Sequence, residues 1–256
     1  MPTLRAAVIL AVFLTVTLIL IPVQWLGVTL RLPYIRALPH AYHRFVAWLF
    51  GIHIRVIGAR PKVEGGAKGA LLLANHTGWM DIVIFSAVMP LSFIAKSEVN
   101  TWPFFGTLAR LQRTIFVTRA RRSETGATTD QLRERLRQGD TLVLFAEGTS
   151  SDGNDVLPFK SALLGAAETA EIIVQPVSAA YTGIHGIPMG RETRPLFAWY
   201  GDMELVPHLW EALKAGPLDV VVEFHPPLDT EDRKELAKTA ERLVRAGQVR
   251  ALAGQT

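Results

Sequence analysis

His76 and Asp81 lie five positions apart and form the pair of side chains most suited to proton transfer in this sequence. If Asp81 lies in the first turn of a helix that follows His76, its carboxylate can fold back onto one imidazole nitrogen, fix the tautomer and stabilise the imidazolium. The other nitrogen can then take a proton from an alcohol, because histidine titrates near neutral pH. An acid in a first helical turn is also common without any catalytic role, since it opposes the helix dipole. The spacing therefore predicts a contact between His76 and Asp81, but by itself it does not decide whether the pair is catalytic.

Two short apolar runs precede the polar residues that could share a site with this pair. Ala70–Ala74 and Thr141–Phe145 have the continuous apolar pattern of strands buried on both faces. Each run is followed by a polar loop that contains glycine, and these loops carry His76 and Glu147. Because sites in open α/β sheets form at the carboxyl ends of strands, we expect His76 and Glu147 to lie in one site.

The rest of the chain alternates strand and helix patterns. Further strands are predicted at residues 52–56, 115–118, 172–180 and 219–224. Helices are predicted at residues 79–88, 130–138 and 161–169, and a C-terminal helix capped by Thr230 at residues 230–250. This alternation predicts an α/β fold with a mainly parallel sheet flanked by helices.

Charge is distributed unevenly along the 256 residues. Seven of the 27 basic residues and none of the 23 acidic residues precede Glu64. A basic, apolar N-terminus favours an anionic membrane surface as partner. Nucleic acid is a less favoured partner, because the basic residues do not alternate with aromatic residues and no known nucleic-acid-binding motif accompanies them. Later in the chain is a basic cluster that could meet anionic lipid or an acidic carrier protein, or simply be a solvated face: Arg110, Arg113, Arg121 and Arg122.

The N-terminal segment is also apolar enough to associate with a membrane. Residues 6–30 are uncharged and long enough to cross a hydrocarbon core, although Pro22 and Gln24 leave a kinked or re-entrant helix open. Residues 38–50 have the pattern of an interfacial helix, or of one packed against the body. We therefore divide the chain into membrane-anchoring helices at 1–50 and a catalytic domain at 51–256. The positive-inside bias of Arg31, Arg36 and Arg44 places the body on the cytoplasmic face of the membrane.

Several classes of chemistry are excluded by composition. The chain has no cysteine, so it has no disulfide framework, no thiolate metal site and no cysteine nucleophile. It also lacks the Gly-x-Ser-x-Gly elbow of serine hydrolases. No metal is expected, because four of the histidines lack ligand spacing: His53, His185, His208 and His225.

The motif at residues 75–81 resembles the Asn-His, four residues, Asp motif of the glycerolipid acyltransferase family, which includes 1-acylglycerol-3-phosphate acyltransferases. Three further blocks resemble the family's later motifs in order and spacing, at residues 114–119, 145–150 and 173–177. Smaller matches are at residues 95–98, 102–106 and 158–160. The resemblance covers about residues 70 to 180 and implies the glycerolipid acyltransferase fold for the body, as an acyltransferase domain.

The resemblance also implies roles. His76 would be the general base on an acceptor hydroxyl and Asp81 its orienting partner. The hydroxyl would attack the thioester of an acyl carrier protein or of CoA directly, with no cofactor. The acceptor head group would be held by Arg119, Glu147, Gly148, Thr149 and Ser150, with Lys96 and Lys160 as candidates for which a solvated lysine is an equally good interpretation.

One departure from the family pattern concerns the acceptor. The third motif usually ends Glu-Gly-Thr-Arg, whereas this chain has Ser150 there and Asp152 close by. Loss of a cation should disfavour phosphate. The run resembles the bacterial branch that acylates lyso-ornithine lipid, whose head group has an amine and a carboxylate; Asp152 could meet the amine and Arg119 the carboxylate. The alternatives are lysophosphatidic acid as acceptor, a thioester hydrolase, and a non-catalytic lipid-binding protein.

Overall fold

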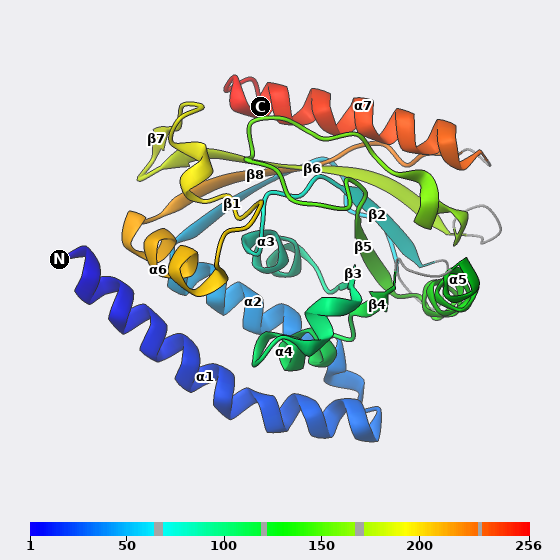
Figure 1. Cartoon of the computed structure of the whole chain (residues 1–256), viewed down its shortest axis with the longest axis horizontal. Coiled ribbons are helices and arrows are strands. Elements are labelled where there is room, and N and C mark those ends of the chain that lie inside the picture. Colours follow the sequence, from blue (N-terminus) through cyan, green and yellow to red (C-terminus); the bar gives the residue numbers. More distant parts are fainter. Residues whose placement is uncertain (64–68, 119–121, 167–171, 230–231) are drawn as a thin grey trace.

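The computed structural model describes residues 1–63, 69–118, 122–166, 172–229 and 232–256. In this part of the chain, strands form one sheet in the order β1-β8-β6-β2-β5-β3-β4, with β7 paired to β6 (Figure 1). The strands are β1 (Ile52–Ile57), β2 (Ala70–Ala74), β3 (Ser92–Lys96), β4 (Ile115–Val117), β5 (Thr141–Phe145), β6 (Ile173–Ile184), β7 (Ile187–Pro188) and β8 (Leu218–Phe224). β8 and β7 pair antiparallel to β6, and the other described pairs are parallel. The predicted mainly parallel α/β sheet is confirmed, and β3 is a strand that the sequence analysis missed.

Helices cover both faces of the sheet. α7 (Arg233–Leu252) lies on one face, and α2 (Ala37–Phe50), α3 (Met80–Val88) and α6 (Leu205–Ala215) lie on the other (Figure 1). Successive residues of a strand point to opposite faces. Leu72 accordingly packs with α2, α3 and α6, whereas Leu71 and Leu73 pack with α7 and with α5 (Arg122–Arg137). Both faces of β2 are therefore covered, and this explains its uninterrupted apolar sequence.

Several predicted boundaries shift in the structure. The C-terminal helix is capped by Asp232, whose Oδ1 accepts hydrogen bonds from the backbone N–H groups of Lys234 (2.7 Å) and Glu235 (3.0 Å). The predicted cap, Thr230, is wrong in that role and lies outside the described residues. The predicted helix at 161–169 is a 3₁₀ helix over Ser161–Ala166 in its described part, and the helix predicted from residue 130 begins at Arg122. The sequence analysis also missed α6 and α4 (Phe105–Leu111).

The N-terminal segment forms one continuous helix, α1 (Pro2–Leu30), which continues through Pro22. It lies along the body beneath α2, α6 and α4 (Figure 1). Arg5 Nη1 donates to the carbonyl of Leu213 (2.9 Å), and Gln24 Nε2 donates to the carbonyls of Ile35 and Leu111 (3.0 Å each). The side of α1 away from the body exposes large apolar side chains, including Val8, Leu18, Ile19, Trp25 and Leu30. Among the described residues, α1 is the helix whose length and composition would allow it to cross a membrane.

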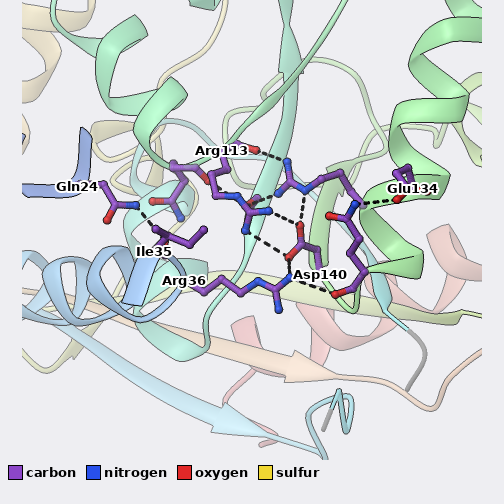
Figure 2. A network of polar contacts seen from close by, with 10 residues as sticks. Gln24, Ile35, Arg36, Arg113, Glu134 and Asp140 are labelled. Carbon is purple, nitrogen blue, oxygen red and sulfur yellow. Dashed lines mark hydrogen bonds and ion pairs between the residues drawn. The ribbon is translucent and has the colours of Figure 1, made fainter. Parts of the chain in front are cut away.

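A buried carboxylate joins the α1–α2 connection to the body (Figure 2). Asp140, directly before β5, accepts from Arg36 Nη2 (2.6 Å) and Arg113 Nη2 (3.0 Å), and also pairs with Arg135. Arg36 lies between the 3₁₀ turn Pro33–Ile35 and α2. Arg113 is therefore neither a solvated nor a lipid-facing residue, in contrast to both interpretations of its basic cluster. Arg36 thus ties the N-terminal helices to an acid that two arginines of the body, Arg113 and Arg135, also hold.

Candidate active site

The contact predicted between His76 and Asp81 is present. His76 Nδ1 lies 2.8 Å from Asp81 Oδ2, and Asp81 is fully buried in the first turn of α3. The same oxygen accepts from the backbone N–H groups of Thr77 (2.7 Å) and Gly78 (3.0 Å). Because Oδ2 accepts all three bonds, the imidazole carries its proton on Nδ1 and leaves Nε2 as an acceptor. This arrangement has the form of a general base with its orienting carboxylate.

The plane of the imidazole is held by an aromatic stack. The His76 ring lies 3.9 Å from the ring of Phe145, at an angle of 15° between the planes. Phe145 is in turn stacked with Phe93, at 6.0 Å between centroids. The His76 side chain is 20% exposed, so the ring remains accessible from one side. Phe145 ends β5, and the sequence analysis gave it no role.

Strand register brings His76 and Glu147 to the same edge of the sheet. β2 and β5 pair in parallel with Ala74 opposite Phe145, so the two residues follow their strands by an equal number of positions. The two loops are joined by a hydrogen bond from the Ser151 N–H to the His76 carbonyl (2.9 Å). The expectation that both loops form one site therefore agrees with the geometry.

Glu147 is 1% exposed and lies beneath its loop. Its Oε1 accepts from the N–H of Leu157 (3.2 Å), whereas Oε2 has no hydrogen-bond partner among the described residues. Burial raises the pKa of Glu147 to about 8; hydrogen bonds from the backbone of Leu157 and His76 oppose the shift, and the charge of Asp81 adds to it. The carboxyl group is therefore mainly protonated at neutral pH.

The described members of the other predicted head-group residues lie at the same edge, with different exposure. Gly148 has a φ of +69°, which lets the loop turn directly after Glu147. Thr149 is exposed and Ser150 is half-buried. Lys96 ends β3, the neighbour of β5, and its side chain is exposed, as is that of Lys160. Arg119 lies outside the described residues. The binding roles of all these residues stay predictions.

A buried arginine missed by the sequence analysis supports the loop from the other side. Arg194 donates to the carbonyls of Met189 (2.9 Å) and Tyr181 (3.1 Å) and to Asn154 Oδ1. Asp152 accepts from the backbone and side-chain amides of Asn154, at 2.9 Å each. Although partial burial opposes it, these bonds and the charges of Arg191 and Arg194 lower the pKa of Asp152. Asp152 is thus an ionised, partly exposed carboxylate near the His76–Asp81 pair, here called the dyad.

β6 contacts the site at two points: Asn75 binds to its backbone, and Tyr181 is one of its residues. The side-chain amide of Asn75 exchanges two hydrogen bonds with Ala179, donating to its carbonyl and accepting from its N–H (2.9 Å each). The hydroxyl of Tyr181, two positions further along β6, donates to Asp81 Oδ1 (2.8 Å). Asn75 was part of the motif without an assigned role. Tyr181 gave no signal, because a single aromatic in an apolar strand is ordinary.

An apolar cavity of about 230 Å³ lies between α1, α2, α3 and β3, and neither His76 nor Asp81 lines it. Trp79 and Phe93 line it, and these residues link the cavity to His76: Trp79 follows in the same loop, and Phe93 stacks on Phe145. Most of the remaining lining is aliphatic or aromatic, including Phe13, Leu20, Val46 and Leu108. Such a cavity suits a hydrocarbon chain, since each buried methylene contributes about 0.8 kcal/mol.

Comparison with known proteins agrees with this geometry. A family model described as Acyltransferase matches residues 53–180. A lyso-ornithine lipid O-acyltransferase from Brucella abortus (strain 2308) is 50% identical, over 99% of this chain and 97% of that protein. One from Rhizobium meliloti (strain 1021) is 43% identical, over 91% of this chain and 82% of that protein. A 1-acyl-sn-glycerol-3-phosphate acyltransferase from Neisseria gonorrhoeae is 35% identical, over 73% and 72% of the two chains.

The crystal structure of a 1-acyl-sn-glycerophosphate acyltransferase from Thermotoga maritima is similar in fold. Its TM-score to this chain is 0.68, and the match covers 97% of both chains at 22% sequence identity. At that identity the similarity concerns the fold. The sheet and its flanking helices, including the N-terminal ones, therefore have a counterpart in a solved structure.

Proposed function

The chain belongs to the acyltransferase family and is an acyltransferase, and we propose that it moves a fatty acyl chain from a thioester to the hydroxyl of a lysolipid, with lyso-ornithine lipid as the favoured acceptor. The observation that carries the proposal is the His76–Asp81 pair, which Trp79 and Phe93 connect to an apolar cavity. This geometry provides a base for a hydroxyl and, close to it, a space for a hydrocarbon chain.

In the proposed reaction, His76 Nε2 takes the proton of the acceptor hydroxyl as the hydroxyl oxygen attacks the thioester carbonyl. Asp81 stabilises the positive charge that develops on the imidazole. The tetrahedral intermediate then collapses, the C–S bond breaks, and His76 returns the proton to the leaving thiolate. A C–O bond replaces a C–S bond, so no redox step, acyl-enzyme or cofactor is needed.

The N-terminal helices would present this site to the bilayer. The exposed apolar side of α1 and the exposed Trp48 of α2 suit contact with lipid. Because α1 and α2 also line the cavity, an acyl chain could pass from the membrane into the site without crossing water. Arg31 and Arg44 favour the cytoplasmic face, where anionic lipid attracts basic residues.

The preference for lyso-ornithine lipid rests on charge as well as on similarity. Ser150 leaves the loop without the cation that suits a phosphate, and Asp152 provides a carboxylate for an ammonium group. Arg119 and the exposed Arg191, whose charge acts on Asp152, are the candidates for the acceptor's carboxylate. The relatives from Brucella and Rhizobium support the same acceptor. Lysophosphatidic acid is the second candidate, because the relative from Neisseria is also more than 30% identical.

The test is purified protein in mixed micelles with one labelled acyl group, supplied on acyl carrier protein or on CoA, and a panel of lysolipids. We expect lyso-ornithine lipid to be acylated at least as efficiently as lysophosphatidic acid. Use of lysophosphatidic acid alone would reject the acceptor. Release of free fatty acid at the same rate without acceptor would indicate a hydrolase, and lipid binding without turnover would reject catalysis.

A further inference from the structure

The two oxygens of Asp81 have different partners. Oδ2 accepts three hydrogen bonds from the segment that surrounds it, namely His76, Thr77 and Gly78. Oδ1 accepts from the hydroxyl of Tyr181, a residue 100 positions away on β6. Tyr181 is 1% exposed, so water does not replace this donor in the folded protein. The dyad is thus completed by a residue outside the motif that contains it.

We propose that Tyr181 is a positioning residue for acyl transfer. Its hydroxyl fixes the rotation of the Asp81 carboxylate and reduces the effect of the carboxylate's negative charge on His76. The carboxylate can turn about its Cβ–Cγ bond unless both oxygens are held. With Oδ1 fixed by Tyr181, the lone pairs of Oδ2 stay directed at His76 Nδ1. A hydrogen bond to Oδ1 also draws negative charge away from Oδ2, which moderates the proton affinity of the imidazole.

Tyr181 is itself held in place by β6 and its surroundings. Ala179, two positions earlier, exchanges two hydrogen bonds with Asn75, the residue before His76. The buried guanidinium of Arg194 donates to the Tyr181 carbonyl (3.1 Å). Burial and the charge of Asp81 keep the pKa of Tyr181 well above its usual value, so the hydroxyl stays protonated across the working range of the enzyme. The donor is therefore present at every pH at which His76 can act.

The charged neighbours of the dyad are few. His76 is hydrogen-bonded to Asp81, and no lysine or arginine of the described residues forms an ion pair with Asp81. Glu147, on the loop after β5, contributes a charge only when it is deprotonated, and Arg245 of α7 acts on Glu147. Arg194 contacts the main chain of Tyr181 and not its hydroxyl. In the part of the chain that the structure describes, Oδ1 therefore depends on the Tyr181 hydroxyl for its stabilisation.

The test is Tyr181→Phe, which keeps the ring and removes the hydroxyl. We expect kcat to fall by about tenfold, because a hydrogen bond to a charged group is lost, while KM changes by less than about twofold. We also expect the acidic limb of the kcat/KM profile to move to higher pH. Without the hydroxyl, the full negative charge of Asp81 acts on the imidazolium and makes it harder to deprotonate. A fluorinated tyrosine at this position, a stronger donor of the same shape, should move the limb to lower pH.

The matched control is Ser178→Ala. Ser178 is buried on the same strand, and its hydroxyl contacts His225 Nε2 (3.2 Å) rather than the dyad. This variant should keep both kcat and the acidic limb. An unchanged limb in Tyr181→Phe, with or without a loss of kcat or thermal stability, would overturn the proposal and leave a structural role. If Tyr181→Phe does not fold, an unmoved limb in the fluorinated protein is the overturning result.

The proposal rests on acyl transfer by His76 and not on the identity of the acceptor. The assays therefore use whichever lysolipid the wild-type protein accepts, with His76→Ala measured in parallel. An active His76→Ala variant would reject the proposed function. An inactive His76→Ala variant together with a Tyr181→Phe variant like the wild type would reject only the role of Tyr181.

Discussion

Glu147 provides the sharpest prediction. A glutamate in a sequence motif is normally taken to be charged, whereas the environment of Glu147 favours its neutral form. Burial raises the pKa of Glu147 to about 8 from the usual 4.5. At pH 7 the group is about one unit below its pKa, so the neutral form exceeds the charged form by about tenfold. Glutamine has nearly the same shape and is always neutral. We therefore expect Glu147→Gln to keep acyl transfer at pH 7 to within about threefold of wild type.

The pH dependence separates the two proteins. Above about pH 8 the wild-type carboxyl ionises and places a second negative charge beside Asp81, whereas glutamine does not. The folded-state pKa is raised, so the stabilisation from this group is fully present below pH 4.5 and is lost as the pH rises through about 8. As the pH rises from 6 towards 9, the wild-type protein should accordingly lose thermal stability relative to Glu147→Gln, because only the wild-type carboxyl loses a proton.

The assay measures acyl transfer and thermal unfolding of both proteins across that pH range, with Glu147→Ala as the control. Alanine leaves the Leu157 N–H without its acceptor, and an unsatisfied buried group costs about 1–3 kcal/mol, so this variant should be less stable at every pH. A folded Glu147→Gln protein that has lost transfer at pH 7 would show that the charged carboxylate is required. A stability difference that does not change with pH would show that Glu147 does not titrate in this range.

Three further predictions test the dyad, the membrane surface and the acceptor site. His76→Ala should lower transfer by roughly 10²–10⁴-fold while circular dichroism stays native, and Asp81→Asn should be severely impaired; near wild-type turnover in a folded His76→Ala protein would reject the mechanism. Leu18→Asp combined with Ile19→Asp, on the exposed side of α1, should weaken sedimentation with anionic vesicles and spare transfer in micelles, and unchanged sedimentation would reject this surface. Ser150→Arg should shift the ratio of catalytic efficiencies towards lysophosphatidic acid by about tenfold, since a charge-assisted bond contributes about 1.5–3 kcal/mol; an unchanged ratio would place residue 150 outside the head-group pocket.

The sequence predicted the parts of the site that have local signals. β2 and β5 are short apolar runs followed by polar loops, and parallel pairing brings the ends of such strands together. The contact of His76 with Asp81 needed a loop and one helical turn, which the sequence also indicated. The strand and loop patterns and the His76–Asp81 contact depend on residues a few positions apart, and the general rule for parallel sheets supplied the longer-range meeting of β2 with β5.

The parts that the sequence did not predict depend on distant partners. Tyr181 bonds to Asp81 across 100 positions, and nothing in the strand around it distinguishes a hydroxyl that contacts Asp81 from a ring that only packs in the core. Arg113 looked like a surface cation, because its partner Asp140 is a single acid 27 positions away. Arg194 is buried, and it donates to backbone carbonyl groups, which every residue type has and which the sequence therefore cannot indicate. Long-range polar contacts of this kind follow from the fold and are not visible in composition or spacing.

The two buried acids of the candidate site differ in their hydrogen-bond partners, and this difference bears on the proposed role of His76. Asp81 has donors on both oxygens, an arrangement that suits a charged carboxylate and supports the imidazolium form of His76. Glu147 has an oxygen without a partner among the described residues and a raised pKa, so it holds a proton at neutral pH. In the proposed mechanism His76 must release its proton to the leaving thiolate, and a second charged carboxylate nearby would raise the proton affinity of the imidazole. If His76 is the base, the Tyr181 hydroxyl on Asp81 and the burial of Glu147 act in the same direction, because each reduces the negative charge that acts on the imidazole.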